Sequence, residues 1–243
     1  MFSIFKKRKN SAPVDFSGIG TDMHSHLLPG IDDGSPDSAT SAELKKGLED
    51  LGYSKFIATP HIMWDMYKNT PTTISGAAAT LKAHSQHENI RFAAEYFLDD
   101  HFDEMLDRDE ELLTITGKRI LVEFSFVSPP LNLKEKIFNL SIKGFEPILA
   151  HPERYAYFSG NKAIYDQLRD MGCLFQLNIL SLTGYYGKIT QELSHYLISK
   201  NYIDYLGTDL HHQRHLDAFR YAQPIMPVIN QLLDSGKIQN SLL

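Results

Sequence analysis

The chain has 243 residues, of which 42% are hydrophobic, and a formal net charge of −6. This length suits one large domain with a full core, and α/β barrels commonly have this size. The negative net charge argues against a basic face that would bind nucleic acid. No apolar run approaches the roughly 20 residues of a membrane span. The single cysteine, Cys173, excludes an intrachain disulfide and is typical of a reducing compartment such as the cytoplasm.

The N-terminus differs from the rest of the chain in charge. Lys6, Lys7, Arg8 and Lys9 make it basic, and it lacks the apolar core and cleavage site of a secretory signal. We predict that residues 1–16 form a basic, flexible tail and that residues 17–243 form one domain.

Short apolar runs alternate with longer helical patterns along the whole domain. The runs predict strands at 19–23, 56–59, 90–97, 119–126, 145–150, 174–179 and 202–207. The patterns between them predict helices at 37–51, 72–87, 102–113, 132–143, 162–171, 189–200 and 214–232. This repeat indicates a parallel sheet with helices outside it, and a doubly wound open sheet is one alternative. Polar clusters follow nearly every strand rather than one switch point, which favours a closed barrel with its site at the C-terminal strand ends.

The stretch 21–37 carries the densest polar pattern. His24 and His26 lie two residues apart, so an extended chain would point both imidazoles to the same side. The turn that follows contributes Asp32 and Asp33, and a helix is expected to begin near Ser35. This stretch therefore predicts half of a metal site.

Side chains that can bind metal recur at the other strand ends. Glu95 and Glu123 each interrupt an apolar run, where a carboxylate without a partner would be costly. The predicted ligands are His24, His26, Asp33, His61, Glu95, Glu123, His151, Asp209 and His211. Nine ligands are too many for one ion and suit two or three. Nitrogen and oxygen donors favour manganese, iron or zinc.

An arginine follows each of the last two histidine motifs. Arg154 lies three residues beyond His151, and Arg214 lies three beyond His211. Guanidinium groups beside metal ions suit a phosphate, so we predict Arg154, Arg214 and Asp209 as catalytic residues, with a surface salt bridge as the alternative for either arginine. Asp22 shares a side with His24 and is expected to orient a ligand. The residues expected to line the rim are Met63, Trp64, Tyr155, Tyr157, Tyr185 and Tyr186.

These motifs together resemble a known family. Asp-Met-His-Ser-His-Leu-Leu-Pro-Gly-Ile-Asp-Asp-Gly at 22–34, Thr-Pro-His at 59–61, His-Pro-Glu-Arg at 151–154 and Asp-Leu-His at 209–211 look like the polymerase-and-histidinol-phosphatase (PHP) superfamily. Within it, the chain is similar over about 21–220 to the bacterial manganese-dependent tyrosine phosphatases of capsule and exopolysaccharide operons. The resemblance implies a distorted (βα)7 TIM-like barrel, three Mn2+ ions on the nine ligands, and Arg154 as the phosphate-binding arginine. The spacing between His211 and Arg214 departs from the pattern of that branch.

The function that this resemblance implies is phosphomonoester hydrolysis by a hydroxide held between two metals. The expected substrate is a phosphotyrosine-bearing bacterial tyrosine kinase that regulates capsule or exopolysaccharide synthesis. The alternatives are a phosphatase or phosphodiesterase for a small molecule such as histidinol phosphate, a non-catalytic binding module, and metal-dependent amide hydrolysis. A cysteine mechanism is not expected, because no arginine lies near Cys173 in a phosphate-binding loop.

Overall fold

The computed structural model describes residues 13–85 and 89–243. In these residues, strands and helices alternate, and the paired strands all run parallel. The strands are β1 (Thr21–Ser25), β2 (Lys55–Ala58), β3 (His61–Ile62), β4 (Ile90–Phe92), β5 (Glu95–Phe97), β6 (Arg119–Glu123), β7 (Glu146–Ala150), β8 (Leu174–Asn178) and β9 (Tyr205–Gly207). The helices are α1 (Ser38–Asp50), α2 (Pro71–Ser85), α3 (Asp100–Asp107), α4 (Leu133–Ile142), α5 (Ala163–Asp170), α6 (Lys188–Ser199), α7 (Gln213–Arg220) and α8 (Met226–Asp234).

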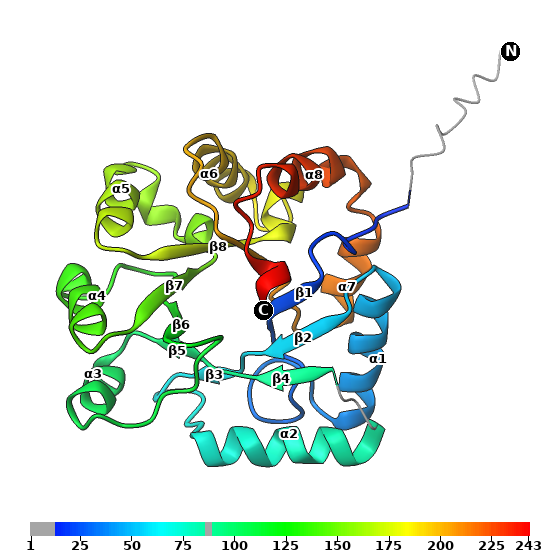
Figure 1. The fold of residues 1–243 in the computed structure, drawn as a ribbon, viewed down its shortest axis with the longest axis horizontal. Coiled ribbons are helices and arrows are strands. Elements are labelled where there is room, and N and C mark those ends of the chain that lie inside the picture. Colours follow the sequence, from blue (N-terminus) through cyan, green and yellow to red (C-terminus); the bar gives the residue numbers. More distant parts are fainter. Residues whose placement is uncertain (1–12, 86–88) are drawn as a thin grey trace, which may run out of the picture.

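The strands form a distorted barrel with the helices outside it (Figure 1). One sheet has the order β1-β2-β4, and the other has the order β3-β5-β6-β7-β8-β9. The two sheets meet where Ser25, the last residue of β1, forms a parallel bridge with Leu210, which follows β9. There, the Asp209 N–H donates to the His24 carbonyl at 2.8 Å. The predicted α/β barrel is therefore confirmed over the doubly wound open sheet.

The structure differs from expectation at two of the seven predicted strands. The run 56–59 corresponds to β2, and a further strand that was not predicted, β3, follows it after Pro60. The run 90–97 divides into β4 and β5 at Ala93 and Ala94. Proline has no N–H to donate to a strand ladder, which explains the break between β2 and β3. The two interrupted segments remain hydrogen-bonded to each other, because the Glu95 N–H donates to the Pro60 carbonyl at 3.0 Å. These breaks distort the barrel on the side that leads into His61 and Glu95.

The predicted helices are present, with three corrections. The segment 214–232 is two helices rather than one, because a short 3-10 turn that contains Pro224 (Gln223–Ile225) separates α7 from α8. The first helix begins at Ser38 and not near Ser35, because Asp37 caps it by accepting from the Thr40 N–H at 2.8 Å. The helix predicted at 102–113 ends at Asp107. Residue 87, where α2 was expected to end, lies outside the described residues.

The core has two parts. A small apolar cluster takes side chains from β1, β2, β6, β7 and β9, so it fills the inside of the barrel. The larger cluster lies between strands and helices and contains Val14 and Phe16. The packed part of the chain thus begins before the predicted boundary at residue 17; residues 1–12 of the predicted tail lie outside the described residues. None of the helices in the described residues is long and apolar enough to cross a membrane.

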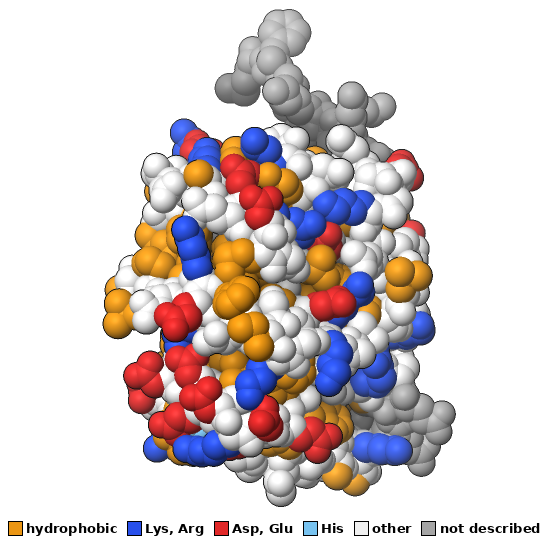
Figure 2. All heavy atoms as spheres, turned by 60° about the vertical axis from the view of Figure 1, so that its left-hand side comes forward, with side chains coloured by type: hydrophobic (Ala, Val, Ile, Leu, Met, Phe, Trp, Pro, Cys, Tyr) orange, Lys and Arg blue, Asp and Glu red, His pale blue; other side chains and the backbone are white. Residues whose placement is uncertain are grey.

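Figure 2 looks onto the side that carries α3, α4 and α5, where hydrophobic side chains reach the surface beside acidic and basic ones. Phe138 and Ile142 of α4 are among the exposed large hydrophobic residues of the chain.

Candidate metal centre

The nine predicted ligands converge at one end of the barrel. His24 lies in β1 and His26 follows it, His61 lies in β3, and Glu95 and Glu123 lie in β5 and β6. The remaining four come from the turn after β1 and from the segments after β7 and β9. Their ligand atoms form four overlapping groups, each within 4.8 Å: His26, Asp33, His61 and His211; His24, His151 and Asp209; His24, His26 and Glu95; His61, Glu95 and Glu123.

Glu95 lies at the centre of these groups. Its Oε1 is 3.3 Å from both His24 Nε2 and His151 Nε2, and its Oε2 is 3.1 Å from His61 Nδ1 and 3.5 Å from His26 Nε2. The side chain is fully buried, yet neither oxygen has a hydrogen-bond partner among the described residues. A buried carboxylate in this state is costly unless a cation lies beside it.

The charges of the site also point to cations. Burial raises the pKa of Glu123 and the neighbouring Glu95 raises it further, well above its ordinary value. Burial lowers the pKa of His24, but Glu95 and Asp209 outweigh it and raise that pKa. In the absence of metal, protons would therefore compensate the carboxylates. Cations that displace these protons would find ligands of the charge and type that they prefer.

Side chains behind the ligands fix the orientation of two imidazoles. Asp32 Oδ2 lies 2.8 Å from His26 Nδ1 and accepts the His61 N–H at 3.1 Å. Gln176 Oε1 lies 2.8 Å from His24 Nδ1. Each imidazole is thereby turned so that its Nε2 faces the cluster, as in metal sites whose ligands are held by carboxylates or amides. Gly34 is needed here, because a Cβ at that position would lie 2.3 Å from His26 Cβ.

We expect Asp32→Asn to weaken metal binding by about 10- to 100-fold. Both oxygens of Asp32 accept, Oδ1 from the Gly34 N–H and Oδ2 from His26 and the His61 N–H, whereas an amide offers only one acceptor oxygen. Titration of the metal-free protein with Mn2+ measures this change. The matched control is Asp65→Asn, an exposed aspartate beyond His61. An unchanged affinity in Asp32→Asn would show that His26 needs no support from this carboxylate.

Two ligand positions have unusual backbone angles. His151 has φ 33° and Asp209 has φ 50°, both in the left-handed region that non-glycine residues rarely adopt. Such strain persists only where surrounding contacts hold it, and it is concentrated at functional sites. Here, the two residues are predicted metal ligands that follow the ends of β7 and β9.

Arg154 contacts the cluster from the short 3-10 turn after β7 (Pro152–Arg154). Its Nη1 donates to Asp209 Oδ2 at 2.6 Å, while Asp209 Oδ1 lies 3.4 Å from His24 Nε2. Its Cζ lies 4.4 Å from the ring centre of Phe126 and 4.3 Å from that of Tyr186. The guanidinium group is thus clamped between two rings, with N–H groups left over for a ligand.

Arg214, the second predicted catalytic arginine, lies in α7, and its catalytic role stays a prediction. His212 caps α7 by accepting the His215 N–H, and Arg214 in the first turn is exposed. Within the described residues, it makes no hydrogen bond or ion pair with any of the nine. Asp22 differs from expectation: it accepts from Thr208 N and Oγ1, at 3.0 and 2.7 Å, and not from the His24 ring.

Sequence reasoning missed Gln176, Asn178 and Phe126. Asn178 Nδ2 donates to Asp209 Oδ2 at 3.1 Å. Both amides lie in β8, and polar side chains inside a buried strand are the same signal that identified Glu95 and Glu123. Phe126 gave no such signal, because it reads as the apolar end of a predicted strand.

The fold and the site define an α/β barrel whose strand ends gather side chains that can hold several metal ions. The chain belongs to the family described as capsular polysaccharide synthesis, CpsB/CapC, whose model matches residues 20–219. It is 32% identical over 194 residues to the tyrosine-protein phosphatase YwqE of Bacillus subtilis, covering 78% of this chain and 76% of that protein. It is 24% identical over 200 residues to the tyrosine-protein phosphatase CpsB of Streptococcus pneumoniae, covering 78% of this chain and 82% of the relative.

Solved structures agree with this assignment. A crystal structure from a study of YwqE and CpsB, described as unique metal-dependent tyrosine phosphatases, matches with a TM-score of 0.74 and 28% identity. The match covers 88% of this chain and 93% of that one. The lactonase Lmo2620 of Listeria monocytogenes matches with a TM-score of 0.54 and 11% identity, which shows a shared fold alone.

Proposed function

We propose that this chain is a metal-dependent phosphatase that hydrolyses phosphotyrosine in a protein. The observation that carries the proposal is Arg154, whose guanidinium group lies beside the metal-binding cluster and is bonded to Asp209 within it. A guanidinium next to cations suits a phosphoryl group through charge and paired hydrogen bonds. The names of the relatives, tyrosine-protein phosphatases, support the same substrate class.

The metal ions would be held by the nine ligands predicted from the sequence. Two or three ions fit, since the ligand atoms form overlapping groups that share Glu95 and three of the histidines. We propose Mn2+ as the native ion, with iron and zinc as alternatives on these nitrogen and oxygen donors. Bound divalent cations would offset the charge of the phosphoryl oxygens and make water nucleophilic near neutral pH.

The residues of the chain would then hold and orient the substrate. The clamp of Phe126 and Tyr186 keeps the Arg154 guanidinium flat beside Asp209, so its remaining donors are positioned before a phosphoryl group arrives. Donors fixed in advance stabilise charge that develops on the phosphoryl oxygens as the ester bond breaks. A tyrosyl leaving group has a pKa of about 10 and departs more readily than a serine alkoxide.

We infer the class of protein substrate from the description of the family and from the names of the relatives. Its description names capsular polysaccharide synthesis, and the relatives named above are tyrosine-protein phosphatases. A phosphotyrosine-bearing bacterial tyrosine kinase that regulates capsule or exopolysaccharide synthesis fits both descriptions. We place the reaction in the cytoplasm, which suits a chain with one cysteine.

Cys173 takes no part in this mechanism. Its side chain is fully buried, and burial raises the pKa of its thiol to about 12, so no thiolate forms near neutral pH. We expect Cys173→Ala to keep kcat/KM on a phosphotyrosyl peptide within about twofold of the wild type, and thiol alkylation to leave activity intact. A large loss in a folded, metal-loaded variant would contradict the proposed mechanism.

The experiment that tests the substrate class compares three phosphate esters at saturating Mn2+: a phosphotyrosyl peptide, a phosphoseryl peptide and histidinol phosphate. We expect kcat/KM to be at least tenfold higher for the phosphotyrosyl peptide, a difference of about 1.4 kcal/mol in barrier height. A preference for histidinol phosphate would instead support a small-molecule phosphatase.

A further inference from the structure

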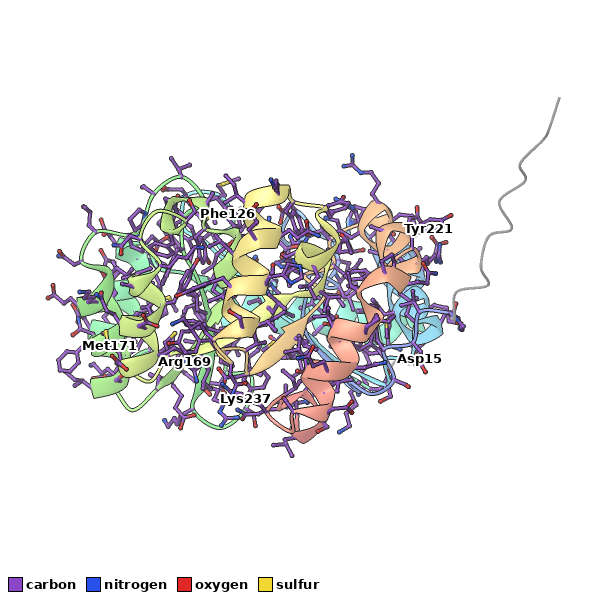
Figure 3. The ribbon with its side chains drawn as sticks, turned by 90° about the horizontal axis from the view of Figure 1, so that it is seen from above. Asp15, Phe126, Arg169, Met171, Tyr221 and Lys237 are labelled. Atoms are coloured by element: carbon purple, nitrogen blue, oxygen red, sulfur yellow. The ribbon has the colours of Figure 1, made fainter. Side chains whose placement is uncertain are left out.

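Phe126 occupies a position at the mouth of the site that the mechanism has used only as support for Arg154. It lies in the loop after β6, three residues beyond Glu123, and 46% of it is exposed. Figure 3 shows it at one end of the barrel, away from Arg169 and Lys237 near the other end. Its ring centre is 5.4 Å from that of His151 and 4.4 Å from Arg154 Cζ.

A phosphate bound by Arg154 brings its leaving group into this neighbourhood. In an aryl phosphate, one ester oxygen separates the phosphorus from the ring, so the ring must lie among the side chains that surround Arg154. Three aromatic residues are near enough to matter. Tyr155 is fully buried, and its hydroxyl donates to the Ala150 carbonyl at 3.1 Å. Tyr186 is partly buried, and its ring centre lies 4.3 Å from Arg154 Cζ.

Phe126 alone among these three contacts both Arg154 and a predicted metal ligand while it keeps close to half of its surface open. The Phe126 ring also stacks with Tyr155 at 5.9 Å between ring centres, and its exposed surface is apolar and open to a second ring. Aromatic pairs gain free energy beyond the burial of their area when they stack or meet edge to face. A serine or histidinol leaving group has no ring at that position.

We propose that Phe126 is a specificity-determining residue, whose exposed surface packs against the phenyl ring of the substrate and selects aryl phosphate monoesters over alkyl ones. The proposal rests on the proposed phosphatase function and deepens it. It assigns the preference for phosphotyrosine to a contact on the leaving group in addition to the acidity of the phenol. Phe126 is a positioning residue as well, since it also covers Arg154, and the test must separate these two roles.

Two phosphonates separate them by equilibrium binding, which needs no turnover. Phenylphosphonate carries a ring and methylphosphonate does not, and both offer the same oxygens to Arg154 and the metals. Calorimetry on the Mn2+-loaded protein gives both affinities in the wild type, Phe126→Ala, Phe126→Tyr and the control Val127→Ala. Val127 is the neighbouring residue, is 88% exposed, and has no role in the site.

We expect Phe126→Ala to weaken phenylphosphonate binding at least about fivefold and methylphosphonate binding less than about twofold. Phe126→Tyr, which keeps the ring, should retain the preference, and Val127→Ala should bind both compounds like the wild type. Equal weakening of both compounds in Phe126→Ala would overturn the proposal and leave Phe126 as a support for Arg154. Unchanged affinity for both would also overturn it.

Failure of this proposal and failure of the proposed function give different results. If the wild type binds phenylphosphonate more tightly than methylphosphonate through Phe126 but hydrolyses no phosphotyrosyl peptide, the specificity contact stands and the phosphotyrosine substrate fails. If the wild type hydrolyses the peptide but Phe126→Ala keeps the full preference for the aryl compound, the phosphatase stands and the specificity contact fails.

Discussion

Glu95→Gln should abolish phosphatase activity, with a loss of kcat/KM of at least about 1000-fold. Glu95 lies within 3.5 Å of four histidines, and both of its oxygens face the cluster. Glutamine keeps the shape of the side chain but removes the negative charge and one of the two acceptor oxygens. The site would then lose the ligand that joins its groups, and we expect fewer bound ions per chain.

Metal analysis and peptide hydrolysis on the same preparation measure both effects. The matched control is Glu192→Gln, which removes the charge of an exposed glutamate on α6 that pairs with Lys188. It should keep full metal content and activity. If Glu95→Gln bound the same number of ions as the wild type and kept its activity, Glu95 would not be a ligand.

Arg154→Ala should lower kcat/KM on a phosphotyrosyl peptide by about 100-fold, the effect typical of losing one fixed donor to developing charge. Arg154→Lys should recover only part of this, because an ammonium group cannot lie flat between Phe126 and Tyr186 or bind phosphate through a fork. Metal content should be measured in both variants, since Arg154 is bonded to Asp209.

Arg214→Ala is the variant to compare with Arg154→Ala, because each arginine lies three residues after a predicted histidine ligand. Arg214 is exposed on α7, so we expect this variant to keep kcat/KM within about threefold of the wild type. A loss as large as that of Arg154→Ala would show that Arg214 reaches the substrate after all. A loss below tenfold in Arg154→Ala would remove the main argument for a phosphate site.

The convergence of the nine predicted ligands could be expected, because a parallel barrel brings the C-terminal ends of its strands together. Glu95 and Glu123 were visible in the sequence as carboxylates inside apolar runs, and His24 and His26 as a pair with strand spacing. Each of these signals is local. The barrel topology, which was predicted from the alternation of strands and helices, then places these side chains at one end of the barrel.

The residues that escaped prediction act through contacts between distant segments. Gln176 reaches His24 across 152 positions of sequence, and nothing near either residue indicates that pairing. Arg154 and Arg214 have the same spacing from a ligand, but the cap at His212 begins a helix that leaves Arg214 exposed. Phe126 looked like ordinary strand core, and its exposure follows from β6 ending at Glu123.

The central claim is that bound metal and Arg154 together hydrolyse phosphotyrosine. The most direct test removes metal from the protein with a chelator and then measures hydrolysis of a phosphotyrosyl peptide before and after Mn2+ is restored. We expect no activity in the metal-free protein, recovery as two or three ions bind per chain, and no recovery in Glu95→Gln. Full activity in the metal-free protein, or metal binding without any hydrolysis of the peptide, would contradict it.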